Sequence, residues 1–314
     1  MEIGQILVCP KCRAKLITSD TGARCNTCHH EYTHRQGFLD VILPINSTFR
    51  NTEKDFWDYA YTQEEERQMH ERNSYFHHHF RRPLISLPPG SIILELGCGN
   101  RADALEIAQA GHEIVETDIS WHALAYAKKL AQSVGVVDQA HFLLAEAEHL
   151  PFEDCSFNGV LIAAALHHLA NPAAGLREMA RVVKPGGYVV LGVEPNRWPY
   201  ITIYRLLAPL KKYIRKKRQR QFDSIADDQT EGFSKKQLRI LFMDAGLQVQ
   251  EILPVKYVTE LYDSYIRLKN RLQKKEAKPS ANWMARYTKI DKMISKIPLI
   301  NNFSWHWNVI AIRP

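Results

Sequence analysis

Long apolar runs are missing from this chain of 314 residues: no stretch approaches the ~18 apolar residues that a membrane-spanning helix needs. The first residues, Met1-Glu2-Ile3-Gly4, also lack the basic region and apolar core of a secretory signal. These absences predict a cytoplasmic protein with no transmembrane segment. A peripheral position at the inner membrane surface stays open.

Cysteine is scarce, and four of the six cysteines lie within the first 28 residues. They form Cys9-x-x-Cys12 and Cys25-x-x-Cys28, a spacing that presents four thiolates in the form of a tetrahedral zinc site. A reducing cytoplasm argues against disulfides. We therefore expect a structural zinc-ribbon module over residues 1–43. Three nearby histidines are less favoured replacements for a thiolate: His29, His30 and His34.

Acidic residues are scarce in the C-terminal third. Residues 200–314 hold 23 Lys and Arg against 10 Asp and Glu, whereas residues 1–199 hold 18 against 24. Eight of the basic residues lie between positions 205 and 220, with no acid among them. This segment is predicted to be part of a lid-like insertion at about 198–232, on a helix with an apolar stripe. RNA, an anionic membrane surface or solvent alone could face its charges.

The remaining chain alternates between strand and helix patterns. Residues 44–87 are expected to be a linker followed by helices, in which His77-His78-His79 lies on a solvated face rather than at a metal. From residue 88 to 314 the alternation predicts an α/β fold with a doubly wound, mainly parallel, seven-stranded sheet of Rossmann-like form. Its expected strands are 92–96, 114–118, 141–144, 159–163, 188–193, 247–252 and 307–312.

The stretch 92–100 reads as a buried strand that enters a glycine turn before a helix, which is the form of a nucleotide site. Its glycines, Gly97 and Gly99, also fit the dinucleotide fingerprint, and Asp118 follows about 20 residues later. Glu95 distinguishes the two ligands, because a carboxylate at that position would repel a pyrophosphate. It suits S-adenosylmethionine (SAM), which carries an ammonium, a sulfonium and no phosphate.

Five motifs in order resemble the class I SAM-dependent methyltransferase superfamily, in particular the branch of the quinone C-methyltransferases with a methyltransferase type 11 core. They lie at residues 95–99, 116–120, 145–152, 156–169 and 177–187. The resemblance implies that Asp118 binds the ribose hydroxyls and that Ile119 lies against adenine. It also implies that Glu146 accepts the adenine amino group, where the family commonly has Asp. The other implied cofactor residues are Glu95, Gly97, Cys98, Gly99, Ala147 near the ring and Ala163 near the methionine.

A catalytic base is not fixed by these patterns. His167 and His168 are candidates for deprotonating an acceptor, although histidines in this loop of the family often serve packing. Methyl transfer from a sulfonium depends mainly on in-line positioning, so a dedicated base is not required. A structural role is expected for Asn158, which stands where the family usually has Asp.

The predicted function is methyl transfer to a small-molecule, lipid-linked or glycan-linked acceptor. An RNA methyltransferase is the alternative, because the cysteine module resembles ribbons of some rRNA guanine methyltransferases and of small tRNA methyltransferase activators. A non-enzymatic RNA- or partner-binding protein with a vestigial SAM site is a second alternative. A nicotinamide-dependent oxidoreductase fits the sequence least, because Glu95 disfavours a pyrophosphate.

Overall fold

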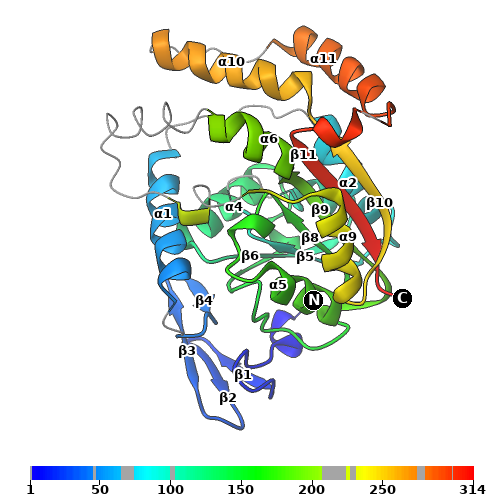
Figure 1. The fold of residues 1–314 in the computed structure, drawn as a ribbon. Coiled ribbons are helices and arrows are strands. Elements are labelled where there is room, and N and C mark those ends of the chain that lie inside the picture. Colours follow the sequence, from blue (N-terminus) through cyan, green and yellow to red (C-terminus); the bar gives the residue numbers. More distant parts are fainter. Residues whose placement is uncertain are drawn as a thin grey trace.

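The computed structural model describes residues 2–44, 47–64, 74–99, 103–206, 224–226, 231–273, 280–298 and 300–314. Figure 1 shows a central twisted sheet with helices on both faces, a small N-terminal sheet at one end and a pair of helices at the other. The arrangement is the predicted doubly wound α/β fold.

Seven strands form the core of the sheet in the order β7-β6-β5-β8-β9-β11-β10. Neighbours from β7 to β9 are parallel, while β11 is antiparallel to both β9 and β10. The seven-stranded, mainly parallel sheet is therefore confirmed. The bounds are β5 Ile92–Leu96, β6 Glu113–Asp118, β7 Ala140–Leu144, β8 Phe157–Ala163, β9 Val183–Pro195, β10 Gln248–Val255 and β11 His306–Ile312.

Helices cover the two faces because successive strand side chains point to opposite sides. In β5, Ile93 packs in one apolar cluster with Phe80 and Leu124, whereas Leu94 packs in the other with Leu176. The first face carries α2 Ser74–Ile85, α3 Leu105–Gln109 and α4 Trp121–Ser133; the second carries α5 Pro172–Val182 and α9 Lys235–Asp244. The cluster residues are buried on both faces, which fixes the register of the strands.

The cysteine module is continuous with this sheet. Its strands are β1 Leu16–Ser19, β2 Gly22–Cys25, β3 Glu31–Arg35 and β4 Phe38–Asp40, preceded by the 3-10 turn η1 Ile3–Ile6. They are antiparallel to one another, but β4 is parallel to β7, with Leu39 opposite Leu143. The module is thus an extension of the central sheet (Figure 1).

The remaining helices lie around the carboxyl ends of the strands. Helix α1 Thr48–Glu64 contacts α4, and α10 Val258–Gln273 pairs with α11 Ala281–Ile294. Short helical segments lie between the strands and the longer helices: η2 Val137–Gln139, η3 Leu166–His168, α6 Arg197–Pro199, η4 Tyr200–Tyr204 and η5 Asn301–Phe303. In the described part of the chain, no helix is both long and apolar enough to cross a membrane.

Most of the predicted basic helix lies outside the described residues. The structure describes positions 198–206, as α6, η4 and the start of a further helical turn, and then resumes at 224. The prediction for 207–223, including its lid-like role, therefore stays a prediction.

The expectation that His77, His78 and His79 lie on a solvated face is wrong for two of them. His77 is buried, with its Nδ1 2.8 Å from Asp103 Oδ1, and His79 Nε2 is 3.4 Å from a Glu251 carboxylate oxygen. Only His78 is exposed. Consecutive helical side chains diverge by about 100°, so His77 meets the segment before α3 while His79 meets β10.

Candidate active site

One cavity of about 540 Å³ opens at the carboxyl ends of β5, β6 and β8, a size typical of small-molecule sites. All nine residues predicted to bind the cofactor line it: Glu95, Gly97, Cys98, Gly99, Asp118, Ile119, Glu146, Ala147 and Ala163. Separate segments of sequence therefore meet at one place, where parallel strands end side by side.

The glycine turn after β5 forms the floor of the cavity. Gly97 has φ +64° and Gly99 has φ +54°, in the left-handed region that glycine adopts without strain. A Cβ on Gly97 would lie 3.0 Å from the Ala165 Cβ, so a larger residue would crowd this turn. The backbone here can therefore approach a ligand closely, as the predicted SAM cradle requires.

Asp118 ends β6 at the cavity wall. One carboxylate oxygen accepts the Ser120 N–H at 2.9 Å, and the other accepts the Gly99 N–H at 3.0 Å. Burial raises the pKa of Asp118 to about 6, although these backbone hydrogen bonds oppose the shift. Ser120, rather than Asp118, caps α4 through the Ala123 N–H. The Asp118 carboxylate instead holds the glycine turn through the Gly99 N–H.

Glu95 lines the cavity but also supports its wall. Its carboxylate accepts the N–H groups of Asp103 and Ala104, at 3.1 and 2.8 Å, at the start of α3. Burial next to the acidic Glu116 raises the pKa of Glu95 well above its ordinary value. A direct contact between Glu95 and a ligand ammonium stays a prediction.

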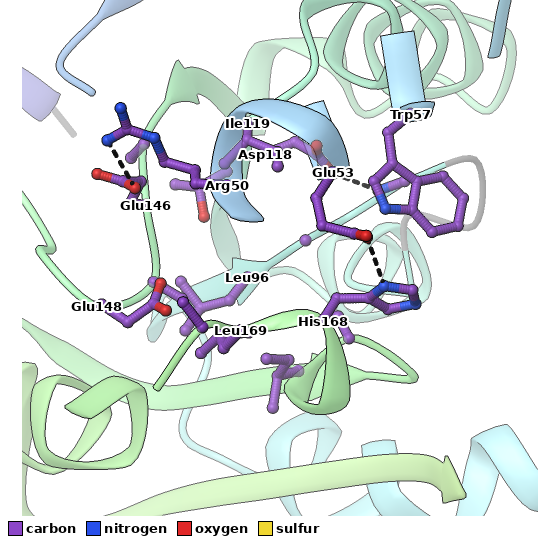
Figure 2. A pocket seen from close by; sticks show the side chains of 18 of the residues that line it. Arg50, Glu53, Trp57, Leu96, Asp118, Ile119, Glu146, Glu148, His168 and Leu169 are labelled. Carbon is purple, nitrogen blue, oxygen red and sulfur yellow. Dashed lines mark hydrogen bonds and ion pairs between the residues drawn. The ribbon is translucent and has the colours of Figure 1, made fainter. Parts of the chain in front are cut away.

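On another side of the cavity, Glu146 faces Arg50 of α1 (Figure 2). Arg50 Nη1 donates to Glu146 Oε1 at 3.0 Å, and burial raises the pKa of Glu146 even though this arginine opposes the shift. Among the described residues, Glu146 Oε2 is buried without a hydrogen-bond partner. An adenine amino group could supply the missing donor.

The two candidate bases have different surroundings. His168 lines the cavity, and its Nδ1 is 2.9 Å from Glu53 Oε2 of α1 (Figure 2). His167 is instead held against β9, with Nδ1 2.9 Å from the carboxylate of the fully buried Glu194. Only His168 is placed to meet a substrate in the cavity.

Glu53 is a buried carboxylate with several donors. Besides His168 it accepts the Ser224 hydroxyl at 3.0 Å and the Ala226 N–H at 3.0 Å. Burial opposes its ionisation, but the hydrogen bonds from His168 and Ala226 outweigh burial and lower the pKa of Glu53. An ionised Glu53 places the His168 proton on Nδ1, which leaves the basic lone pair on Nε2.

Sequence reasoning missed four residues of α1 that line the cavity: Phe49 and, on one helix face, Arg50, Glu53 and Trp57. The Trp57 ring lies 5.1 Å from the His168 ring. A signal was available, because the last three positions follow the i, i+3, i+7 spacing of one helix face. Nothing in the local sequence indicated that this face would cover a site whose strand-end residues begin only at Glu95, 38 positions after Trp57.

The four N-terminal cysteines converge at a second place. Their sulfur atoms all lie within 4.8 Å of one another, with Cys9 and Cys28 3.7 Å apart and Cys12 and Cys25 3.4 Å apart. Thiolates around a tetrahedral zinc would be separated by about 3.8 Å. In the described chain His29, His30 and His34 are not part of this cluster.

The environment of Cys25 favours a thiolate. Burial opposes ionisation, but the N–H groups of Cys28 and Thr27, each 3.4 Å from its sulfur, outweigh burial and lower its pKa to about 6. This donor set fits zinc.

Comparison with known proteins identifies the class. The family model described as "Methyltransferase domain" matches residues 94–191, which hold the glycine turn, Asp118, Glu146 and His168. Together with the fold and the relatives below, this shows that residues 94–191 form a methyltransferase domain of the class I SAM-dependent kind.

The individual proteins that the chain resembles share about a third of its residues or fewer over the aligned regions. The chain is 29% identical to the demethylmenaquinone methyltransferase of Bacillus cytotoxicus over 183 residues, which cover 55% of this chain and 77% of that protein. It is 34% identical to the 27-O-demethylrifamycin SV methyltransferase of Amycolatopsis mediterranei over 110 residues, 35% of this chain and 40% of that protein. The fold is similar to that of phospholethanolamine N-methyltransferase 2 of Haemonchus contortus. That likeness has a TM-score of 0.54 and 18% identity, covering 87% of this chain and 61% of the other.

Proposed function

We propose that this methyltransferase acts on a small-molecule acceptor bound beneath α1, and that His168 deprotonates the acceptor. The observation that carries the proposal is the 2.9 Å contact between His168 Nδ1 and Glu53 in the cavity wall. The relatives support a small acceptor, because the named ones act on demethylmenaquinone and 27-O-demethylrifamycin SV. Lipid-linked and glycan-linked acceptors remain within this proposal.

The chemistry assigns a role to each wall of the cavity. SAM, held by the glycine turn, Asp118 and Glu146, would supply the methyl cation equivalent. His168 Nε2 would take the proton of an acceptor hydroxyl, so that the oxygen, or a ring carbon conjugated to it, attacks the methyl carbon in line. Glu53 would stabilise the imidazolium that forms. The leaving group of this transfer would be S-adenosylhomocysteine.

The test uses methyl-labelled SAM with fractionated lipid, small-metabolite and RNA extracts. We expect label in the lipid or small-metabolite fraction with the wild-type chain. In His168→Gln we expect a roughly 100-fold lower rate, the lower range for loss of a general base, with SAM affinity unchanged. His78→Gln, an exposed histidine on α2, is the control and should keep full activity.

Two outcomes would contradict the proposal. An unchanged rate in His168→Gln would show that His168 is not the general base, although the protein would still be a methyltransferase. Label confined to RNA would favour the alternative acceptor, which the basic 205–220 segment and the cysteine module also support. The membrane or RNA contact of that segment is likewise a proposal, because 207–223 lie outside the described residues.

We also propose that Cys9, Cys12, Cys25 and Cys28 bind a structural zinc ion. The convergence of four sulfur atoms and the N–H donors at Cys25 support it. Metal analysis of purified protein should give one zinc per chain, which Cys12→Ser should lose. A chain that is metal-free in both forms would contradict this part.

A further inference from the structure

The helices α10 and α11 lie side by side at the end of the molecule opposite the cysteine module (Figure 1). Large apolar side chains are exposed along them. On α10 these are Leu261, Tyr265 and Leu268, and on α11 they are Trp283, Ile290 and Met293. The spacings i, i+4, i+7 and i, i+7, i+10 place each set on one stripe of its helix.

The exposed apolar side chains continue beyond α11. Ile297, Ile300 and Phe303 follow in the next turns, and the Phe303 ring packs edge-on against Trp198 at 5.0 Å. Trp198, Ile203 and Leu206 are themselves exposed. We call these residues, together with the two stripes, the outer apolar surface. Apolar patches of this extent on a folded protein mark a contact with something else.

The exposed charges of α11 have one sign. Exposed basic residues accompany the α11 stripe: Arg286, Lys289, Lys292 and Lys296. Asp291 of α11 is buried and accepts the N–H groups of Tyr257 and Val258, and Asp263 of α10 is half-buried. Glu260 is also buried and pairs with Lys256. No acidic side chain is exposed among the described residues of α10 and α11.

We infer that the outer apolar surface docks on an anionic lipid bilayer. Trp283, Ile290 and Met293 would enter the boundary between headgroups and acyl chains, while the neighbouring lysines meet lipid phosphates. This is the pattern of an interfacial helix, with an apolar stripe, basic flanks and a tryptophan. The inference does not depend on which acceptor the enzyme methylates.

Other occupants match the surface less well. RNA would satisfy the lysines but leaves Ile290 and Met293 without an apolar partner. A second copy of the chain would cover the apolar side chains but would bring two sets of lysines face to face. A bilayer offers both an apolar interior and a negative surface.

The test measures co-sedimentation of the full-length protein with vesicles. Vesicles of phosphatidylcholine and phosphatidylglycerol in equal parts should bind it, and binding should weaken as salt rises. Pure phosphatidylcholine vesicles should bind it much less. In the double variant Ile290→Ser/Met293→Ser we expect at least about a tenfold loss of vesicle affinity, because two side chains that enter the acyl boundary lose their apolar surface.

A matched control lies on α9. Ile240 and Met243 have the same spacing and similar exposure, 45% and 62% against 41% and 70% for Ile290 and Met293, but lie outside the outer apolar surface. Ile240→Ser/Met243→Ser should bind vesicles as the wild type does. SAM binding should be equal in all three proteins, which shows that each is folded.

Three results would overturn the inference. The first is equal binding to neutral and anionic vesicles, and the second is equal vesicle binding by the two double variants. The third is an absence of vesicle binding together with a dimer in sedimentation velocity that Ile290→Ser/Met293→Ser dissociates. Transfer of methyl groups to a water-soluble acceptor would persist in the α11 variant, so failure here is separable from failure of the proposed function.

Discussion

At the scale of single residues, the cavity wall depends on buried carboxylates with unequal affinities for protons. Asp118 has a pKa of about 6, well above the ordinary aspartate value, because burial disfavours its charge. Glu53 has a pKa below its ordinary value, because His168 and backbone N–H groups stabilise its charge. Both acids ionise as pH rises, but Asp118 does so at a higher pH than an ordinary aspartate and Glu53 at a lower pH than an ordinary glutamate.

We predict that SAM binding weakens as pH falls through about 6. Protonation of Asp118 removes an acceptor for the ribose hydroxyls, so the dissociation constant measured by calorimetry should rise from pH 7.5 to pH 5.5. Asp118→Asn should weaken binding at pH 7.5 by roughly tenfold or more, as for loss of a hydrogen bond to a charged group, and should flatten the pH dependence. Asp138→Asn, at an exposed aspartate, is the control.

The raised pKa of Asp118 also makes the stability of the fold depend on pH. Because the folded pKa of Asp118 lies above its unfolded value of about 3.9, protonation favours the folded state. This contribution is fully present below the unfolded pKa and is lost as pH rises to about 6.

A SAM affinity that is constant between pH 5.5 and 7.5 would contradict the assigned role of Asp118 in SAM binding.

We predict that Glu53→Gln slows methyl transfer without weakening SAM binding. The amide cannot stabilise an imidazolium at His168, so kcat should fall at least tenfold, and the pH profile of kcat should shift. Glu153→Gln at an exposed glutamate that pairs with Lys15 should leave both kcat and its pH profile unchanged. Equal loss of kcat and SAM affinity in Glu53→Gln would indicate a structural role for this carboxylate.

At the scale of elements, the cysteine module is connected to the cofactor side of the cavity. Strand β4 pairs with β7, and the Val41 N–H donates to Leu144 O directly before Ala145 and Glu146. Arg35 Nη2 donates to the carbonyl of Ile119, which lines the cavity. The module thus supports the segments that are expected to hold adenine.

We predict that zinc removal lowers both stability and SAM affinity. A chelator, or Cys12→Ser, should reduce the free energy of unfolding by on the order of several kcal/mol, since binding of structural zinc contributes directly to folding. SAM affinity, measured by calorimetry, should fall with it. Cys155→Ser, outside the cluster, is the control. Unchanged SAM affinity after verified zinc loss would show that the cysteine module pairs with the sheet but does not support the SAM site.

At the scale of the whole molecule, stability depends on the two apolar layers that sandwich the sheet. Phe80 of α2 is fully buried against the sheet in one layer. Phe80→Ala should therefore lower the free energy of unfolding in urea by about 3–5 kcal/mol. Phe303→Ala, at a ring that is 48% exposed, should change it by less than about 1 kcal/mol. A small effect of Phe80→Ala would contradict a tightly packed layer.

Much of the fold could be predicted because its strands and helices are marked locally. Ser120, Asn171 and Ser234 precede the three helices that they cap. The expected strands recur in the structure within a few residues, although β9 extends well before and after 188–193. The histidine triplet was mispredicted because its environment is formed by Asp103 and Glu251, which only the fold brings near.

The sequence alone determined the doubly wound sheet, the glycine turn and the four-cysteine spacing, because each depends on hydrophobic periodicity or on residues close together in the chain. Only the tertiary structure decided that β4 joins the catalytic sheet, that α1 brings Arg50 and Glu53 over the cavity, and that His168 rather than His167 faces it. These features depend on pairings between distant segments, whose geometry no local pattern records.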